Sequence, residues 1–228
     1  AQTIDLSNQS TQLGRGETIK DTARVLSRYC DALAIRTHEN NELIEYAKWS
    51  SRPVINALTD LEHPCQALAD FMTIKESFGS LKGLKLAYVG DGNNVANSLM
   101  ICGALLGVNV RVSTPPGFEP LADVLKQAQG VSVRGAKIEL VNDPIQAVKG
   151  ANAVYTDVWA SMGQEEEQGI RKKAFKNFCL NSKLLSKARP EAIVLHCLPA
   201  HRGEEITEEA LESQSINIFD QAENRLHV

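Results

Sequence analysis

Apolar positions recur with two alternating periods along the chain. Residues 17–29 place Ile19, Ala23 and Leu26 on one face, which is the spacing of an amphipathic helix. Residues 64–78 repeat this pattern, and the proline at their start suits a first helical turn. Short apolar runs lie between the helical segments. We predict strands at these runs, which are residues 32–36, 53–56, 84–89, 108–113, 137–141, 151–156, 192–196 and 216–219.

The order of these segments predicts the fold class. Further helices are expected at residues 40–49, 93–106 and 121–129, and after the Asp143-Pro144 pair. Strands that alternate with helices form mostly parallel sheets, and helices cover both faces of such sheets. A break near residue 80 divides the pattern. We therefore expect an α/β protein with two α/β domains.

The composition argues against several classes of protein. The 228 residues are 43% hydrophobic and 23% charged with a net charge of −4, which argues against disorder and against a broad nucleic-acid surface. The longest apolar run has ten residues, too short for a bilayer. The five cysteines include no C-x-x-C pair, so we expect reduced thiols in a cytosol-like compartment.

Ligands of parallel sheets bind at the carboxyl ends of strands, so the residues after each strand are the candidates. Gly90-Asp91-Gly92 follows the strand at 84–89, and Asn94 comes next as a candidate ligand of a small polar substrate. A dinucleotide site is one interpretation and a simple tight turn is the other. The dinucleotide fingerprint lacks its third glycine, since Val95 stands there, and its acidic residue on the following strand.

Two more strand ends carry candidate chemistry. Asp157, Ser161 and Met162 follow the strand at 151–156, where an acid and a hydroxyl could recognise an amino group or merely cap a helix. Cys197 and Leu198 follow the strand at 192–196, so the thiol is either a nucleophile or part of a pocket wall. A zinc site is a further alternative, with ligands His63, Cys65, His196 and Cys197 at spacings tighter than usual.

The N-terminal third contains two candidate functional residues, an arginine at the end of a strand and a histidine at the start of a helix. Arg36 ends the strand at 32–36, and a guanidinium suits a phosphate or a developing oxyanion. His63 stands at the start of the 64–78 helix with Gln66 one turn on. A single histidine is more often a structural residue than a ligand.

Taken in order, these segments resemble the aspartate/ornithine carbamoyltransferase family. The resemblance rests on His63-Pro64-Cys65-Gln66, Gly90-Asp91-Gly92-Asn93-Asn94, Asp157 with Ser161-Met162-Gly163, and His196-Cys197-Leu198-Pro199. The third and fourth motifs favour ornithine as the acceptor. The resemblance also covers Leu13-Gly14-Arg15-Gly16-Glu17 and Ala222-Glu223-Asn224-Arg225.

The resemblance implies transfer of a carbamoyl group from carbamoyl phosphate to the δ-amine of L-ornithine, which yields L-citrulline and phosphate. Arg36, His63, Gln66 and Arg225 would bind carbamoyl phosphate, and Arg36, His63 and Cys197 would serve catalysis. The ornithine ligands would be Asn94, Asp157, Ser161, Met162, Cys197 and Leu198. The resemblance implies no metal, no cofactor, no nucleic acid and no membrane, and a homotrimer or trimer-based oligomer in the cytoplasm. An organelle stroma is the alternative if an upstream segment carried a transit peptide.

The resemblance also implies a division of the chain. Residues 1–62 would be part of a carbamoyl phosphate domain, 63–79 an inter-domain helix, 80–214 the ornithine domain and 215–228 the start of a returning C-terminal helix. The family's S-x-R-T phosphate motif does not occur in these residues. We therefore expect the N-terminal domain to be incomplete and the chain to be truncated at both ends. An inactive ornithine-binding remnant and a carbamoyltransferase with another amine acceptor are the alternatives.

Overall fold

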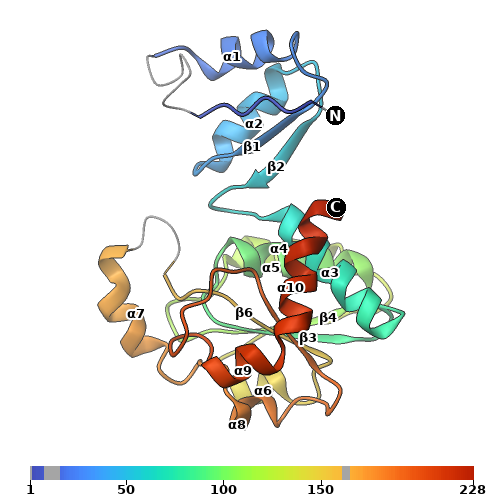
Figure 1. Ribbon diagram of the computed structural model, residues 1–228, viewed down its shortest axis with the longest axis vertical. Coiled ribbons are helices and arrows are strands. Elements are labelled where there is room, and N and C mark those ends of the chain that lie inside the picture. Colours follow the sequence, from blue (N-terminus) through green and yellow to red (C-terminus); the bar gives the residue numbers. More distant parts are fainter. Residues whose placement is uncertain (1, 8–15, 161–164) are drawn as a thin grey trace. The chain divides into compact units, whose positions relative to one another are not determined.

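Residues 2–7, 16–160 and 165–228 are described by the computed structural model shown in Figure 1. The chain divides into two units, residues 1–62 and 63–228. No helix of the described residues is both long and apolar enough to cross a membrane. The two units are taken in turn.

The first unit is a small α/β arrangement. Strands β1 (Leu33–Arg36) and β2 (Val54–Leu58) pair in parallel. Helix α1 (Ile19–Leu26) packs against α2 (Asn40–Trp49), and the unit's apolar core includes the buried first residue of β1 and last residue of β2. Arg36 is exposed at the carboxyl end of β1, as predicted for the strand at 32–36.

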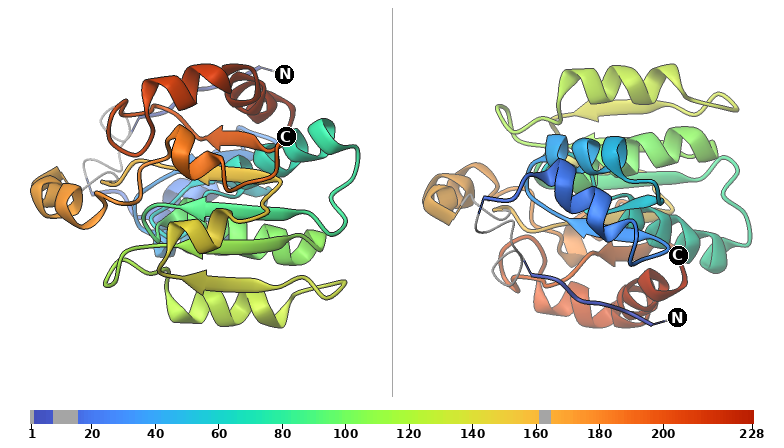
Figure 2. Two further views of the ribbon diagram at one scale, coloured as in Figure 1. Left: turned by 90° about the horizontal axis from the view of Figure 1, so that it is seen from below. Right: turned by 90° about the horizontal axis from the view of Figure 1, so that it is seen from above.

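The second unit is built on a five-stranded parallel sheet in the order β5-β4-β3-β6-β7. Helices lie on both faces of the sheet (Figure 2), so β6 and β7 are fully buried and β3 is buried after its first residue, whereas β5 at the edge is mostly half-buried. Tyr88 and Tyr155 stack on each other between β3 and β6 with ring centroids 5.8 Å apart. The strand bounds are β3 (Lys85–Val89), β4 (Asn109–Ser113), β5 (Ile138–Val141), β6 (Ala153–Thr156) and β7 (Ile193–His196).

The helices of this unit connect and cover the strands (Figure 1). Helix α10 packs along α3 and against β7, and α3 in turn packs against α4. A short 3₁₀ turn at Glu165–Glu167 precedes α7. The helices are α3 (Pro64–Phe78), α4 (Asn94–Leu106), α5 (Ala122–Gly130), α6 (Pro144–Val148), α7 (Gln168–Ala174), α8 (Ser182–Leu185), α9 (Glu208–Ser213) and α10 (Ser215–His227).

The strand order creates a switch point in the middle of the sheet. The chain runs outward from β3 through β4 to β5 and then returns to place β6 on the other side of β3. Loops leaving β3 and β6 therefore diverge, and ligands of such sheets bind in the crevice at this point. The predicted fold class and the five strands of this sheet are confirmed, with bounds within two residues of the expectation.

One predicted element is wrong. Residues 216–219 were predicted as a strand but lie in α10. Ile218 and Gln221 are buried with Asn224, whereas Ile216 and Phe219 are exposed, so burial follows a helical period. A four-residue apolar run is too short to reveal its period, and the polar residues that follow it carry the deciding signal.

Candidate active site

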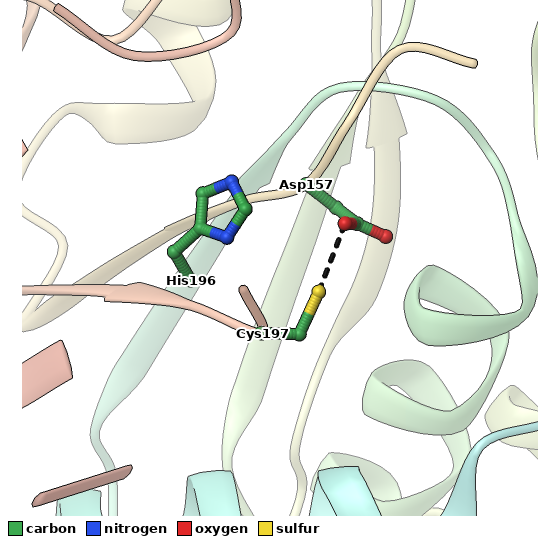
Figure 3. Close-up of side chains that lie close together, drawn as sticks. All are labelled: Asp157, His196 and Cys197. Atoms are coloured by element: carbon green, nitrogen blue, oxygen red, sulfur yellow. Dashed lines mark hydrogen bonds between the residues drawn. The ribbon is translucent and has the colours of Figure 1, made fainter. Parts of the chain in front are cut away.

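Asp157 lies at the centre of the candidate site, directly after β6. The side chain is 5% exposed and accepts three hydrogen bonds. Asn93 Nδ2 donates to Oδ2 at 2.7 Å, Cys197 Sγ donates to Oδ1 at 2.9 Å, and the Val158 N–H donates to Oδ1 at 2.8 Å. Figure 3 shows the Cys197 thiol directed at the carboxylate.

All three donors to Asp157 are neutral groups. No lysine, arginine or histidine of the described residues forms an ion pair with this carboxylate. A buried carboxylate without a cation is costly unless a partner neutralises it. The site is therefore suited to a ligand that brings a positive charge, such as an ammonium group.

Cys197 follows β7 and faces this carboxylate. Burial raises the pKa of its thiol well above the ordinary value, and the nearby Asp157 charge raises it further. The thiol thus stays protonated and acts as a hydrogen-bond donor. A thiolate nucleophile needs an electropositive setting, so the surroundings favour the pocket-wall interpretation of Cys197 over covalent catalysis.

His196 fixes the loop that carries Cys197. Its Nδ1 accepts a hydrogen bond from the Leu198 N–H at 2.8 Å, so Nε2 carries the ring proton and pairs with Glu205 Oε1 at 3.1 Å. Both side chains of the His196–Glu205 pair are fully buried. Leu198 is held at a φ of 56°, a left-handed conformation that this local hydrogen bond accompanies.

The ligand atoms of Asp157, His196 and Cys197 lie within 4.8 Å of one another, which is close enough for a metal. However, both ring nitrogens of His196 already have partners, and the thiol of Cys197 is held in its protonated form. A metal would need a free imidazole nitrogen and a thiolate. Cys65 and His63, the other residues of the predicted zinc alternative, do not belong to this cluster of described residues. The arrangement favours a hydrogen-bonded organic ligand.

Helix α3 presents the second candidate group. His63 is the residue before its first turn, its backbone N–H donates to Ser98 Oγ at 2.7 Å, and Pro64 opens the helix as predicted. Gln66 is the third residue of this helix and is 1% exposed. Arg225 on α10 reaches the same side of the unit as the Cys197 loop, since its Nη1 donates to the Cys197 carbonyl at 3.5 Å.

The Gly90-Asp91-Gly92 turn is closed by the chain itself. A Cβ on Gly92 would lie 2.2 Å from Pro120 N and 2.6 Å from Phe118 O, and the Gly92 N–H donates to that same carbonyl at 2.9 Å. Glycine is needed here because a neighbouring loop of the protein approaches. In a dinucleotide site the cofactor's pyrophosphate takes that place. The tight-turn interpretation therefore accounts for this glycine.

The structure brings some of the predicted residues together. The ends of β6 and β7 bring together Asp157, Cys197, Leu198 and Arg225. Asn94 is the first residue of α4, and its neighbour in sequence, Asn93, contacts Asp157. Arg36 lies in the other unit. Ser161 and Met162 lie outside the described residues.

Sequence reasoning missed Asn93, which both caps α4 and holds Asp157. Its Oδ1 accepts from the N–H groups of Val95 and Ala96, while its Nδ2 donates to Asp157. An asparagine directly before a helical pattern is a recognised cap signal, so its orientation could have been predicted. The second role required knowledge of where β6 ends.

Comparison with known proteins gives the class. Residues 82–228 match the Asp/Orn binding domain of aspartate/ornithine carbamoyltransferase, and residues 1–76 match the carbamoyl-P binding domain of the same enzymes. The chain belongs to the aspartate/ornithine carbamoyltransferase family.

Several similar proteins carry the name of one enzyme of this family. The ornithine carbamoyltransferase of Prochlorococcus marinus is 69% identical over 227 residues, which are 100% of this chain and 71% of the relative. The enzyme of the same name from Thermosynechococcus vestitus is 59% identical and is covered to 73%. Among solved structures, ornithine carbamoyltransferase from Pyrococcus furiosus has a TM-score of 0.90 and 55% identity over 96% of this chain and 70% of its own. The predicted family is confirmed.

Proposed function

We propose that this protein transfers the carbamoyl group of carbamoyl phosphate to the δ-nitrogen of L-ornithine, giving L-citrulline and phosphate. The observation that carries the proposal is the buried Asp157 carboxylate, which has neutral donors and no cation among the described residues. An ornithine α-ammonium would supply the missing charge. The close relatives named ornithine carbamoyltransferase support the same reaction and a role in arginine metabolism.

In this proposal the ornithine ligands surround Asp157. Asn94, Ser161 and Met162 hold the amino-acid end, and Cys197 with Leu198 borders the side-chain amine. The δ-amine must be neutral to attack, because a protonated amine has no free electron pair. A pocket whose negative charge is already satisfied by the α-ammonium does not stabilise a second cation, and so favours the neutral δ-amine.

Carbamoyl phosphate is assigned to a second set of ligands. We propose that His63, Gln66 and Arg225 of the second unit and Arg36 of the first bind it. The δ-nitrogen attacks the carbamoyl carbon and forms an N–C bond, and the electrons of the carbonyl move to oxygen. Donors from Arg36 and His63 stabilise that oxyanion. The carbonyl then re-forms as the bond from carbon to the phosphate oxygen breaks, and the departing phosphate takes the proton that the nitrogen loses.

The division of the chain is part of the proposal. Residues 1–62 act as part of a carbamoyl phosphate domain, 63–79 as an inter-domain helix, 80–214 as the ornithine domain and 215–228 as a returning segment. We further propose a homotrimer or trimer-based oligomer, which light scattering on the purified protein would test, and a cytoplasmic or stromal location.

The function is tested by incubating the protein with carbamoyl phosphate and L-ornithine and measuring citrulline and phosphate, which should form in a 1:1 ratio. We expect His63→Ala and Arg36→Ala to lower the rate by orders of magnitude, because each removes a proposed oxyanion donor. Wild-type rates in both variants would contradict the assignment of those residues. Absence of citrulline with the wild type would contradict the enzyme assignment.

Two outcomes separate the alternatives. Faster turnover of putrescine or an acylated ornithine than of L-ornithine would indicate another amine acceptor. Calorimetry that detects ornithine binding without binding of carbamoyl phosphate would indicate an inactive ornithine-binding protein.

A further inference from the structure

A fully buried carboxylate lies under the Gln66 side chain. Asp70, one turn further along α3, is 0% exposed and accepts two hydrogen bonds at Oδ1. Gln66 Nε2 donates at 2.8 Å, and Gln221 Nε2 on α10 donates at 2.5 Å. The residue that holds Gln66 thus also joins two helices, through a contact between residues 151 positions apart in sequence.

The second glutamine is itself fixed in orientation. Gln221 Oε1 accepts from the backbone N–H of His196 at 2.9 Å, so its amide nitrogen must face Asp70. Gln221 is 0% exposed, so its amide group lies out of contact with solvent. His196 directly precedes Cys197. Asp70 therefore connects the Gln66 amide to the end of the strand that presents the candidate ornithine pocket.

The bond to Asp70 decides which end of the Gln66 amide remains available. Because Nε2 donates to the carboxylate, Oε1 is the other end, and this oxygen is buried with no hydrogen-bond partner among the described residues. A buried acceptor without a partner is costly and suits a ligand N–H donor. The amino group of a carbamoyl compound is such a donor.

We propose that Asp70 is a positioning residue, which orients the Gln66 amide so that its carbonyl oxygen accepts from the amino group of the carbamoyl substrate. This inference rests on the proposed function and adds to it a physical basis for recognising a carbamoyl rather than an acetyl group. An acetyl group has a methyl in place of the amino group and offers no donor.

The surroundings of Asp70 fit this role. Burial raises the pKa of Asp70 to about 7, and the Asp157 charge acts in the same direction, while Gln66, Gln221 and Tyr155 lower it. The other titratable groups coupled to this carboxyl are the thiols of Cys102 and Cys197. Near neutral pH the carboxyl is thus partly ionised, and its hydrogen bonds strengthen as it loses its proton.

The test compares two phosphonates that differ only at this contact. Phosphonoacetamide keeps the amino group of carbamoyl phosphate, and acetonylphosphonate replaces it by methyl. In Asp70→Asn the oxygen that receives both glutamines becomes a neutral amide oxygen, which holds Gln66 Nε2 less strongly than a carboxylate oxygen does. We expect calorimetry to show that the preference for phosphonoacetamide falls by up to about tenfold, as for the loss of one hydrogen bond between neutral groups.

A matched control separates positioning from packing. Asn224 also joins α10 to α3, by hydrogen bonds to Thr73 Oγ1 at 2.9 Å and Glu76 Oε2 at 2.8 Å, and does not contact Gln66. Asn224→Ala should lower the melting temperature and leave the ratio of the two affinities unchanged. In a Gln66→Ala background, Asp70→Asn should have no further effect on that ratio.

Equal loss of both affinities in Asp70→Asn, or an unchanged ratio, would overturn the inference and leave the function standing if the wild type forms citrulline. A wild type that forms citrulline and shows no preference for phosphonoacetamide would overturn the inference alone, and a wild type that forms no citrulline would overturn both. Should Asp70→Asn fail to fold, the wild type decides: the Gln66 side-chain amide resonances in ¹⁵N-labelled, ligand-free protein should titrate with a midpoint near the pKa of Asp70, about 7. Resonances that do not move with pH would refute the link.

Discussion

Two buried aspartates follow neighbouring strands of one sheet and have different partners. Asp91, after β3, forms an ion pair with Arg171 at 3.0 Å, and both side chains are almost fully buried. Asp157, after β6, receives only neutral donors. The first carboxylate is neutralised within the chain, so it serves structure. The second lacks that compensation, so it is the one suited to bind a charged ligand.

The Asp91–Arg171 pair also shows how much burial costs. Burial raises the pKa of Asp91 to about 6, although the adjacent Arg171 lowers it. Arg171 further donates to the Trp159 carbonyl at 2.8 Å and lies over the Phe118 ring. The pair thereby fixes the β3 loop to α7, and we infer that its value lies in holding these loops rather than in net stability.

The sharpest way to break this comparison is Asp157→Asn. The variant keeps the shape and loses the charge that we expect to bind the ornithine ammonium. Removal of one partner of a buried charge pair costs about 3–5 kcal/mol, so kcat/KM for ornithine should fall by about 10²- to 10⁴-fold. Asp91→Asn is the matched control, and steady-state citrulline formation should change far less in it. An equal loss in both variants would show that the two aspartates do not differ in role.

The second prediction concerns stability in Arg171→Met. This change leaves the Asp91 carboxylate buried without its cation, and urea unfolding at pH 8 should show a loss of about 3–5 kcal/mol. In the wild type the raised pKa of Asp91 means that this group's contribution to stability is complete below about pH 4 and is lost as the pH rises to about 6.

Without Arg171 the pKa of Asp91 should rise further, so this loss should extend to higher pH. The stability gap between wild type and Arg171→Met should then be larger at pH 8 than at pH 5. The pH-dependent part should vanish in the double variant Asp91→Asn/Arg171→Met. A gap that is the same at both pH values would contradict the assignment of this part to Asp91.

The smallest predicted effect is that of Asn93→Ala. Loss of the α4 cap should lower the free energy of unfolding by about 1 kcal/mol. Because Asn93 also donates to Asp157, the KM for ornithine should rise by about tenfold. Asn181 caps α8 through the Leu184 N–H and has no hydrogen bond to Asp157, so Asn181→Ala should show the stability loss alone. A wild-type KM in Asn93→Ala would restrict Asn93 to its capping role.

The sequence allowed much of the fold to be predicted because the relevant signals are local. The apolar runs at 84–89 and 108–113 lie within one residue of β3 and β4, and the helix at 64–78 has the bounds of α3. The prediction failed at 216–219, where the apolar run was shorter than the period that it had to reveal. The ordered motifs, ending with His196-Cys197-Leu198-Pro199, also identified the family that the comparisons confirm.

The site was predicted only in part, because some of its contacts join residues that are far apart in sequence. Strand ends pointed to Asp157 and Cys197, whose side chains indeed meet. No local signal showed that Asp70 would receive Gln221, because that contact depends on the packing of α10 against α3. Ser161 and Met162 remain predictions.

The sequence by itself determined which residues stand at strand ends and helix starts, since hydrophobic period, caps and glycines act over a few residues. It presented Asp91 and Asp157 alike, as acids that follow buried strands. Only the tertiary structure decided that Arg171 neutralises one of them and that no cation of the described residues neutralises the other. Charge compensation in a buried setting depends on distance in space, and the chain order does not encode that distance.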